Sequence, residues 1–276
     1  QIRGGMIVDT NTLVVNANED RVGIGTSSPN NLLQVFGLID FNNTDLNTKL
    51  GYQAGTNIVA GAQSNTFLGY QAGYASSTAS TNAADNNTAV GYQSLYFNTT
   101  GGNNTANGYQ SLFSNTTGYE NTANGYQSLY SNTTGYLNTA NGMYSLYFNT
   151  TGGHNTANGY QSLYSNTTGY ENIAIGYASL YYNNTGSKNI ANGYKSLFSN
   201  TTGYRNTANG YQSGSSISTG NSNTFLGYDS GSNANQKVDA INSMALGNGA
   251  YTTASNQVVI GNTSVTQIQL NGGNTV

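Results

Sequence analysis

The sequence predicts an all-β fold, a parallel β-solenoid (β-roll) built from 17-residue coils. A glycine recurs at every seventeenth position through the middle of the chain, over eight intervals without exception. A 17-residue unit is too short for a pair of helices, and its Asn, Thr, Gly and Tyr are poor material for a helix interior. The chain is 6% charged and 11% aromatic, whereas disorder normally combines high net charge with few aromatics. The recurrent glycines are Gly91, Gly108, Gly125, Gly142, Gly159, Gly176, Gly193, Gly210 and Gly227.

Each unit also repeats its apolar residues. A representative unit is NTANGYQSLYSNTTGYE, residues 155–171, in which a tyrosine follows the glycine. A leucine column, predicted to form a core rib, comprises Leu95, Leu112, Leu129, Leu146, Leu163, Leu180 and Leu197. The position after each of these leucines is aromatic in the same seven units. Because identical residues lie over one another in stacked coils, these columns predict continuous apolar ribs.

Each coil is expected to contain two short strands and two turns. Successive coils then stack at the inter-strand spacing of about 4.8 Å. Columns such as Asn121, Asn138 and Asn155 can form amide ladders. We expect the glycine of the recurrent Asn-Thr-Thr-Gly turn to supply a positive φ at little steric cost.

Strand alternation predicts two different faces. Ala123, Gly125 and Leu129 fall on one face, and Thr122, Asn124 and Tyr126 fall on the other. A single coil buries too little apolar surface to offset the ordering of 17 residues. We therefore expect chains to associate along their length, with one face inside the coil and the other between subunits.

Four segments are expected along the chain. They are a β connector at 1–50, irregular coils at 51–86, the regular 17-residue array at 87–228, and 14-residue-type coils with an end strand at 229–276. Residues 6–25 read as strands separated by polar turns. The start, at residues 1–5, reads as the cut end of a longer polypeptide.

Short glycine-centred motifs carry a resemblance to known families. The sequences NTAVG (87–91), NIAIG (172–176), SMALG (243–247) and QVVIG (257–261) resemble head repeats of trimeric autotransporter adhesins of the YadA type. RVGIGTSSP (21–29) and NQVVIGNTSVTQIQL (256–270) resemble phage tail-fibre and related surface-fibre proteins, which often carry a C-terminal self-cleaving chaperone. The resemblance implies a left-handed, homotrimeric roll. Two departures are the longer repeat and the Asn that often replaces the motif's last apolar residue, as at Asn107.

The residues point away from catalysis. His154 is the single histidine, in a column that otherwise varies freely, and Glu120 and Glu171 fall three coils apart, about 14 Å. That separation is too large for a catalytic carboxylate pair, and the central array is too poor in carboxylates for a Ca²⁺ cage. We predict no enzyme, with no catalytic, cofactor-binding or metal-binding residues. Seven scattered basic residues argue against nucleic acid, and the lack of an 18-residue apolar run argues against membrane insertion.

One late position in the unit varies freely, which is typical of a solvent-exposed tip. This column and its neighbour supply the residues predicted as possible surface contacts: Tyr119, Glu120, Tyr136, His154, Tyr170, Glu171, Lys188, Tyr204 and Arg205. The Asn-Thr-Thr segments also match the N-glycosylation sequon in seven units, counting 183–185, but turn chemistry explains them equally well. The stacked tyrosines could hold sugars, although rib packing is the simpler interpretation.

The favoured function is a structural or adhesive fibre segment. It would be a rigid trimeric stalk or head, an extracellular appendage of a virion or cell, attaching to a host-surface glycan or protein receptor. One alternative is an ice- or crystal-surface-binding solenoid, and another is a passive filament spacer. The ice hypothesis uses two threonine columns, one at positions 99, 116, 133, 150 and 167 and the other at 100, 117, 134, 151 and 168.

Overall fold

The fold is a parallel β-solenoid with coils of about 17 residues, as predicted. The computed structural model describes residues 6–9, 13–16, 21–24, 33–35, 39–42, 46–58, 61–75 and 84–268. These residues contain strands and turns but no helix, and they make about 12 turns. The expectations placed on residues 1–5, on residues 25–29 of the motif RVGIGTSSP and on the end of the chain after 268 lie outside the described residues.

Contacts divide the chain into two compact units, Gln1–Glu120 and Asn121–Val276. In the first unit, antiparallel pairs join β1 to β2, β2 to β3, β4 to β5 and β5 to β6, so the segment 6–25 does contain separate strands. From β6 onward the pairing is parallel and the coils begin. The strands are β1 (Met6–Asp9), β2 (Leu13–Asn16), β3 (Arg21–Ile24), β4 (Leu33–Val35), β5 (Ile39–Asn42), β6 (Asn47–Leu50), β7 (Thr66–Leu68), β8 (Thr88–Val90) and β9 (Thr105–Asn107).

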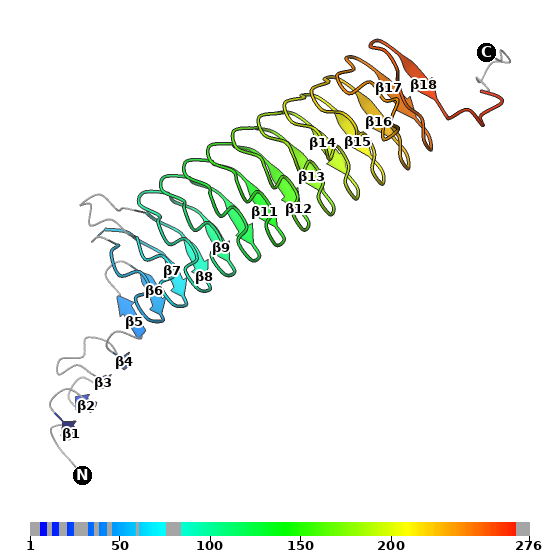
Figure 1. Cartoon of the computed structure of the whole chain (residues 1–276). Coiled ribbons are helices and arrows are strands. Elements are labelled where there is room, and N and C mark those ends of the chain that lie inside the picture. The colour runs from blue at the N-terminus through cyan, green and yellow to red at the C-terminus, as the bar shows by residue number, and fades with distance from the viewer. Residues whose placement is uncertain are drawn as a thin grey trace. The chain divides into compact units, whose positions relative to one another are not determined.

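The second unit is one parallel sheet with one strand from each coil, visible in Figure 1 as a file of arrows. In this register, each residue pairs with the residue at the same position of the next repeat: Ala123 pairs with Ala140, and Ala140 pairs with Ala157. The coil length is 17 residues up to β16, then 20 and 14 residues in the last two steps. The strands are β10 (Thr122–Asn124), β11 (Thr139–Asn141), β12 (Thr156–Asn158), β13 (Ile173–Ile175), β14 (Ile190–Asn192), β15 (Thr207–Asn209), β16 (Thr224–Leu226), β17 (Met244–Leu246) and β18 (Val258–Ile260).

The expectation of two strands per coil is wrong, because each regular coil contains a single three-residue strand. The second apolar segment, Gly-Tyr-Gln-Ser-Leu, cannot be a strand since two of its residues have left-handed backbone angles. In one coil these are Gln161, with φ 55°, and Leu163, with φ 51°. Such angles cost side-chain-bearing residues about 1 kcal/mol or more each.

Hydrogen bonds to both neighbouring coils hold this segment in place. The amide of Gln161 donates to the carbonyl of Met143 in the coil before, and the amide of Leu163 donates to that of Ser179 in the coil after, both at 3.0 Å. The strand alternates in the same way: Thr156 donates forward to Asn172 and Gly159 donates back to Asn141. The backbone is therefore bonded up and down through both walls of the coil, although only one wall is a strand.

The core lies between these two walls. The central alanine of the strand and the leucine of the opposite segment both point inward and are fully buried in the regular coils of each unit. This applies to all seven leucines of the predicted rib. The strand residues on either side of the alanine, Thr and Asn, point outward and are at least partly exposed. The division into an Ala/Leu face and a Thr/Asn/Tyr face therefore matches the burial.

The core keeps its volume by exchanging large and small residues across the two walls. In β16 the central alanine is replaced by Phe225, which is fully buried. The leucine position opposite is then Gly231 in the same coil and Gly214 in the coil before. A Cβ added to either glycine would collide with the Phe225 ring. Phe67 in the first unit repeats the arrangement with Gly55 and Gly73.

Glycine is required in the turns for a different reason from the one expected. The glycines spaced by 17 residues do have positive φ, as at Gly159 with φ 136°. The glycine of Asn-Thr-Thr-Gly does not; Gly135 lies outside the left-handed region. A Cβ at Gly135 would instead collide with the Asn132 side chain and the Gly152 carbonyl. Close approach of the next coil, and not backbone angle, selects glycine in this turn.

The exchange across the core predicts a rescue. Phe225→Ala should lower the free energy of unfolding by about 3–5 kcal/mol, because it leaves a cavity where two glycines face the missing ring. Adding Gly231→Leu should restore part of this loss, since it re-creates the Ala/Leu pair of the regular coils. Gly231→Leu alone should destabilise the protein. Thermal and denaturant unfolding of the four proteins would measure the coupling, and simple additivity of the two changes would contradict it.

Candidate binding surfaces

The freely varying column forms the outer edge of successive turns, as the sequence indicated. Its residues are exposed in both units, and they also have left-handed angles, as at His154 with φ 58° and Glu171 with φ 54°. The amide of His154 donates to the Tyr136 carbonyl of the coil before, at 3.0 Å. The left-handed angle of this turn is thus carried by the variable residue and not by the glycine.

The predicted surface contacts in the second unit pair along this edge. Lys188 lies 3.8 Å from Glu171, with its ammonium 5.7 Å from the Tyr170 ring centre. Arg205 lies against Tyr204 in the same way. The His154 ring packs edge-on against Tyr136, which is half-buried, with ring centres 5.2 Å apart. In the first unit, Tyr119 and Glu120 are exposed.

This edge does not gather charge of one sign. Between Leu137 and Arg205 the column presents, in order, an apolar residue, a histidine, an acid and two bases. The exposed Lys188–Glu171 contact contributes little energy, because solvent screens such pairs. Each coil therefore presents a different side chain at this edge, and the described residues of the edge form no single concave site.

The outward face of the strands is a second surface, and it becomes apolar in the middle of the second unit. Strand β13 presents Ile173 and Ile175 to solvent, with Ile175 42% exposed, and β14 presents Ile190. Beside them runs a file of tyrosines, of which Tyr177 and Tyr194 stack with ring centres 5.1 Å apart. Leu226, Tyr228, Val258 and Ile260 continue the exposed apolar residues further along the unit. Monomeric soluble proteins rarely expose contiguous apolar patches of this kind.

The Asn-Thr-Thr turn is not available for N-glycosylation in the folded chain. Its asparagines are buried, and the Asn166 amide nitrogen donates both to the Gly169 carbonyl at 3.0 Å and to Asn149 Oδ1 at 2.8 Å. Both N–H groups of the amide are therefore used inside the coil stack. The asparagines of the seven sequons are Asn98, Asn115, Asn132, Asn149, Asn166, Asn183 and Asn200.

The asparagines of these turns form an amide ladder in addition to the one expected in the column of Asn121, Asn138 and Asn155. That column does form a ladder: the Asn138 amide nitrogen donates to Asn121 Oδ1 and that of Asn155 donates to Asn138 Oδ1, each at 3.1 Å. Two buried amide ladders thus run through the coil stack of the second unit, and a third on the outward strand face joins Asn124, Asn141 and Asn158 at 2.8 Å. The turn ladder ends at Asn200, whose Oδ1 is buried with no hydrogen-bond partner, because the next coil has Ile217 in this position.

The threonine columns of the turn do not form a free hydroxyl lattice. In the first column, Thr133 Oγ1 donates to the Thr150 carbonyl and Thr150 Oγ1 to the Thr167 carbonyl, both at 3.0 Å. These hydroxyls satisfy the backbone of the next coil, while the second column, which includes Thr151 and Thr168, is exposed. A single exposed file at a turn is a poor match for a two-dimensional crystal lattice, which weakens the ice-binding alternative.

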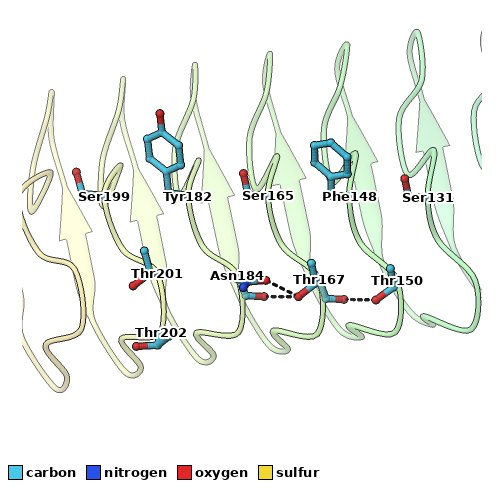
Figure 2. Close-up of a pocket in the computed structure, with 10 residues that line it drawn as sticks. All are labelled: Ser131, Phe148, Thr150, Ser165, Thr167, Tyr182, Asn184, Ser199, Thr201 and Thr202. Carbon is cyan, nitrogen blue, oxygen red and sulfur yellow. Dashed lines mark hydrogen bonds between the residues drawn. The ribbon is translucent and has the colours of Figure 1, made fainter.

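A groove of about 700 Å³ lies on the wall opposite the strands, and sequence reasoning missed it. Two aromatic rings, Phe148 and Tyr182, project from coils two apart, with Ser165 between them (Figure 2). Ser131 and Ser199 lie at either end of the same row, and residues of the Asn-Thr-Thr turns form the other side of the groove. The signal was present in the sequence: the column directly after the aromatic rib is serine at 114, 131, 165 and 199 but aromatic at 148 and 182.

The aromatic rib itself is a continuous stack. Ring centres of Tyr147, Tyr164 and Tyr181 follow one another at 5.4 and 5.0 Å, with planes within 15°. Burial raises the pKa of each of these tyrosines above its ordinary value of 10.0, with repulsion from neighbouring tyrosinates adding to the effect. The stack is therefore a packing element whose hydroxyls stay neutral at physiological pH.

The described residues contain no cluster of three or more His, Cys, Asp or Glu side chains suited to hold a metal ion. Among the same residues, no helix is long and apolar enough to cross a membrane. No family model, curated protein or solved structure matches the chain.

The turn ladder predicts a strong effect of a single charge. Asn166→Asp should lower the melting temperature markedly at pH 7, because it removes two hydrogen-bond donors and buries a carboxylate. Part of the loss should be recovered at acidic pH, where the buried carboxyl is protonated. Thr168→Asp, which places the same carboxylate on the exposed side of the same turn, is the matched control and should change stability little. Equal effects of the two substitutions would show that the buried ladder is not a stabilising element.

The tyrosine stack predicts alkaline instability. Since the folded-state pKa values of Tyr147, Tyr164 and Tyr181 are raised, the folded chain binds more protons than the unfolded chain above pH 10. Stability should therefore be unaffected below this range and fall as the pH rises through the folded-state values. Tyrosinate absorbance and melting temperature between pH 8 and 12 would test this. A Tyr164→Phe variant should lose less stability at high pH than the wild type.

Proposed function

We propose that the chain is a segment of a trimeric surface fibre with a structural and adhesive role. The carrying observation is the outward face of the strands, which exposes Ile173, Ile175 and Ile190 beside a file of tyrosines. A second copy of the same chain can cover such a face along its whole length, because both surfaces repeat with the same coil spacing. Obligate interfaces of homo-oligomers are apolar in this way.

The repeat itself supports a fibre over a compact enzyme. Near-absence of charge, with 6% charged residues in 276, leaves few groups for acid–base or metal chemistry. Repeated coils need capping or a partner to hide their apolar faces, and they readily build long, stiff structures. On this proposal the chain has no catalytic role, and it acts by holding contact residues at a distance from the surface that bears it.

The resemblance to trimeric adhesin heads and tail fibres supports three copies and a left-handed roll. Three of the motifs that carry it, NIAIG (172–176), SMALG (243–247) and QVVIG (257–261), lie on strands β13, β17 and β18. In each strand the middle residue of the three points into the coil and the outer two point out. The outer two are the residues we assign to the contact between chains, on an extracellular appendage of a virion or a cell.

Attachment would use the outer edge of the coils and the wall opposite the strands. These surfaces remain free when the strand face is covered by the other chains. The partners on this proposal are two more copies of the chain and a host-surface glycan or protein receptor. A fibre that serves only as a spacer would assemble in the same way and bind neither.

Light scattering of the soluble chain tests the assembly. The expected mass is three times 28.9 kDa, with a β-rich circular dichroism spectrum. Ile175→Asp should shift the mass towards the monomer, because it places a charge in the buried interface. Thr168→Asp, on the exposed turn, should leave the trimer intact. A β-rich wild-type monomer would overturn the trimer and favour a single-chain solenoid, for which thermal hysteresis is the next measurement.

A further inference from the structure

The groove between Phe148 and Tyr182 interrupts the repeat in a way that the fold does not require. In the column that follows the aromatic rib, the neighbouring units have Ser114, Ser131, Ser165 and Ser199. Coils with serine in this position have the same strand, the same buried leucine and the same turn. Phe148 and Tyr182 are 43% and 49% exposed, so each leaves much of a ring in solvent without a packing need.

The two rings share one orientation. Phe148 stands nearly perpendicular to Tyr147 and Tyr164, at 87° and 80°, and Tyr182 stands nearly perpendicular to Tyr181 and Phe198, at 81° and 76°. Since the rib rings are stacked along the coil axis, both projecting rings lie with their planes along that axis. Figure 2 shows both pointing the same way from the same row of the wall. They form two platforms about 10 Å apart, which is two inter-strand spacings.

The rest of the groove is polar but uncharged. Serine and threonine hydroxyls and the Asn184 side chain line it, and none of the ten lining residues is acidic or basic. Thr167 Oγ1 already contacts Asn184 Oδ1 at 2.5 Å, which orients these two groups along the side of the groove. Aromatic platforms with a few fixed hydroxyl and amide groups are suited to a ligand that has apolar faces and many hydroxyls.

We propose that this groove binds a neutral oligosaccharide chain, lying along the coil axis with sugar rings stacked on Phe148 and Tyr182. The inference deepens the proposed adhesive function and rests on it, because it names the ligand class and the residues. A pyranose ring offers C–H groups on its face to an aromatic ring and hydroxyls at its rim to the Ser and Thr side chains. The separation of the two platforms suits an extended chain of sugars better than a single sugar.

The site stays accessible in the proposed trimer. Strand β12 points Ala157 into the coil and Thr156 and Asn158 outward, while the opposite wall points Leu163 inward and Ser165 outward. The groove and the strand face therefore lie on opposite sides of the same core. A trimer would carry three such grooves, so weak binding at each could give strong attachment to a surface that displays many copies of the glycan.

Serine substitutions test the platforms without disturbing the fold, because serine is already present in this column. Binding of the assembled chain to neutral gluco- and N-acetylglucosamine oligosaccharides, from disaccharide to hexasaccharide, can be measured by calorimetry and on a glycan array. Sialylated and sulfated oligosaccharides provide the comparison for charge. Phe148→Ser and Tyr182→Ser should each weaken binding by at least about tenfold, and both should abolish the preference for longer chains.

Phe97→Ser is the matched control. Phe97 occupies the same column in the first unit and has the same perpendicular contacts, with Tyr96 at 4.7 Å and Phe113 at 5.0 Å. The next two residues of its column are Ser114 and Ser131, so it has no second platform two coils later. Removing it should leave oligosaccharide binding unchanged. All three variants should keep the wild-type melting temperature within a few degrees.

The outcomes separate this inference from the proposed function. Neutral oligosaccharide binding that is lost in Phe148→Ser and Tyr182→Ser, but kept in Phe97→Ser, supports the groove. Glycan binding that survives both substitutions, or that is confined to sialylated or sulfated probes, overturns the groove and leaves an adhesive fibre. If the assembled chain binds no oligosaccharide but still adheres to cells, the groove is again wrong and a protein receptor takes its place. If it neither binds nor adheres, both the groove and the adhesive role fail.

Discussion

Backbone hydrogen bonding between consecutive coils is the constraint on which the rest of this structure depends. Within each unit, both walls of a coil send amides alternately to the coil before and the coil after. This works only if every coil presents its groups at the same height, which a constant coil length provides in the regular array; the 20- and 14-residue steps to β17 and β18 still keep their strands paired. The 17-residue period of the regular array is the result. It brings each side chain into contact with the identical side chain of the next coil.

Self-contact explains the unusual choice of residues. A side chain repeated at about 4.8 Å must attract its own copy, and charged side chains repel theirs. An amide both donates and accepts, an aromatic ring stacks on an identical ring, and an aliphatic chain packs on another. The buried asparagines, the tyrosine stack and the leucine rib are these three solutions. In the regular array, four of the five charged residues, Glu120, Glu171, Lys188 and Arg205, lie at the variable turn position, where each faces solvent and differs from its neighbours; Lys195 is the fifth.

The sequence predicted which residues stack on one another in successive coils, but it did not predict the backbone conformation of the coil. Periodicity alone indicated the solenoid, the buried leucines and the buried ladder of Asn121, Asn138 and Asn155, because each of these follows from residues that repeat at a fixed interval. The single strand per coil could not be predicted, since nothing marks Gln161 and Leu163 for left-handed angles that such residues rarely adopt. Their conformation is imposed by bonds to the coils on either side, which no local propensity contains. The compensation between Phe225 and Gly231 could not be predicted either, because only the folded chain shows that these two positions face each other.

The candidate sites divide in the same way. The exposed turn edge was found because a variable column in a constant repeat indicates solvent. The groove was not predicted because a period indicates what the units share, whereas Phe148 and Tyr182 are departures from the shared pattern. In a repeat protein, residues that obey the period report on the fold, and residues that break it without structural need are the better guide to a partner.

The length of the regular array can change by duplication of a whole repeat. Because every regular coil has the same interior, an added or deleted unit needs no new packing solution, and each extends or shortens the array by one inter-strand spacing. The coils with Phe67 and Phe225 cannot be exchanged in this way, since each needs its own glycines in the right neighbours. They set the limits between which lineages can vary the length while the ends stay fixed.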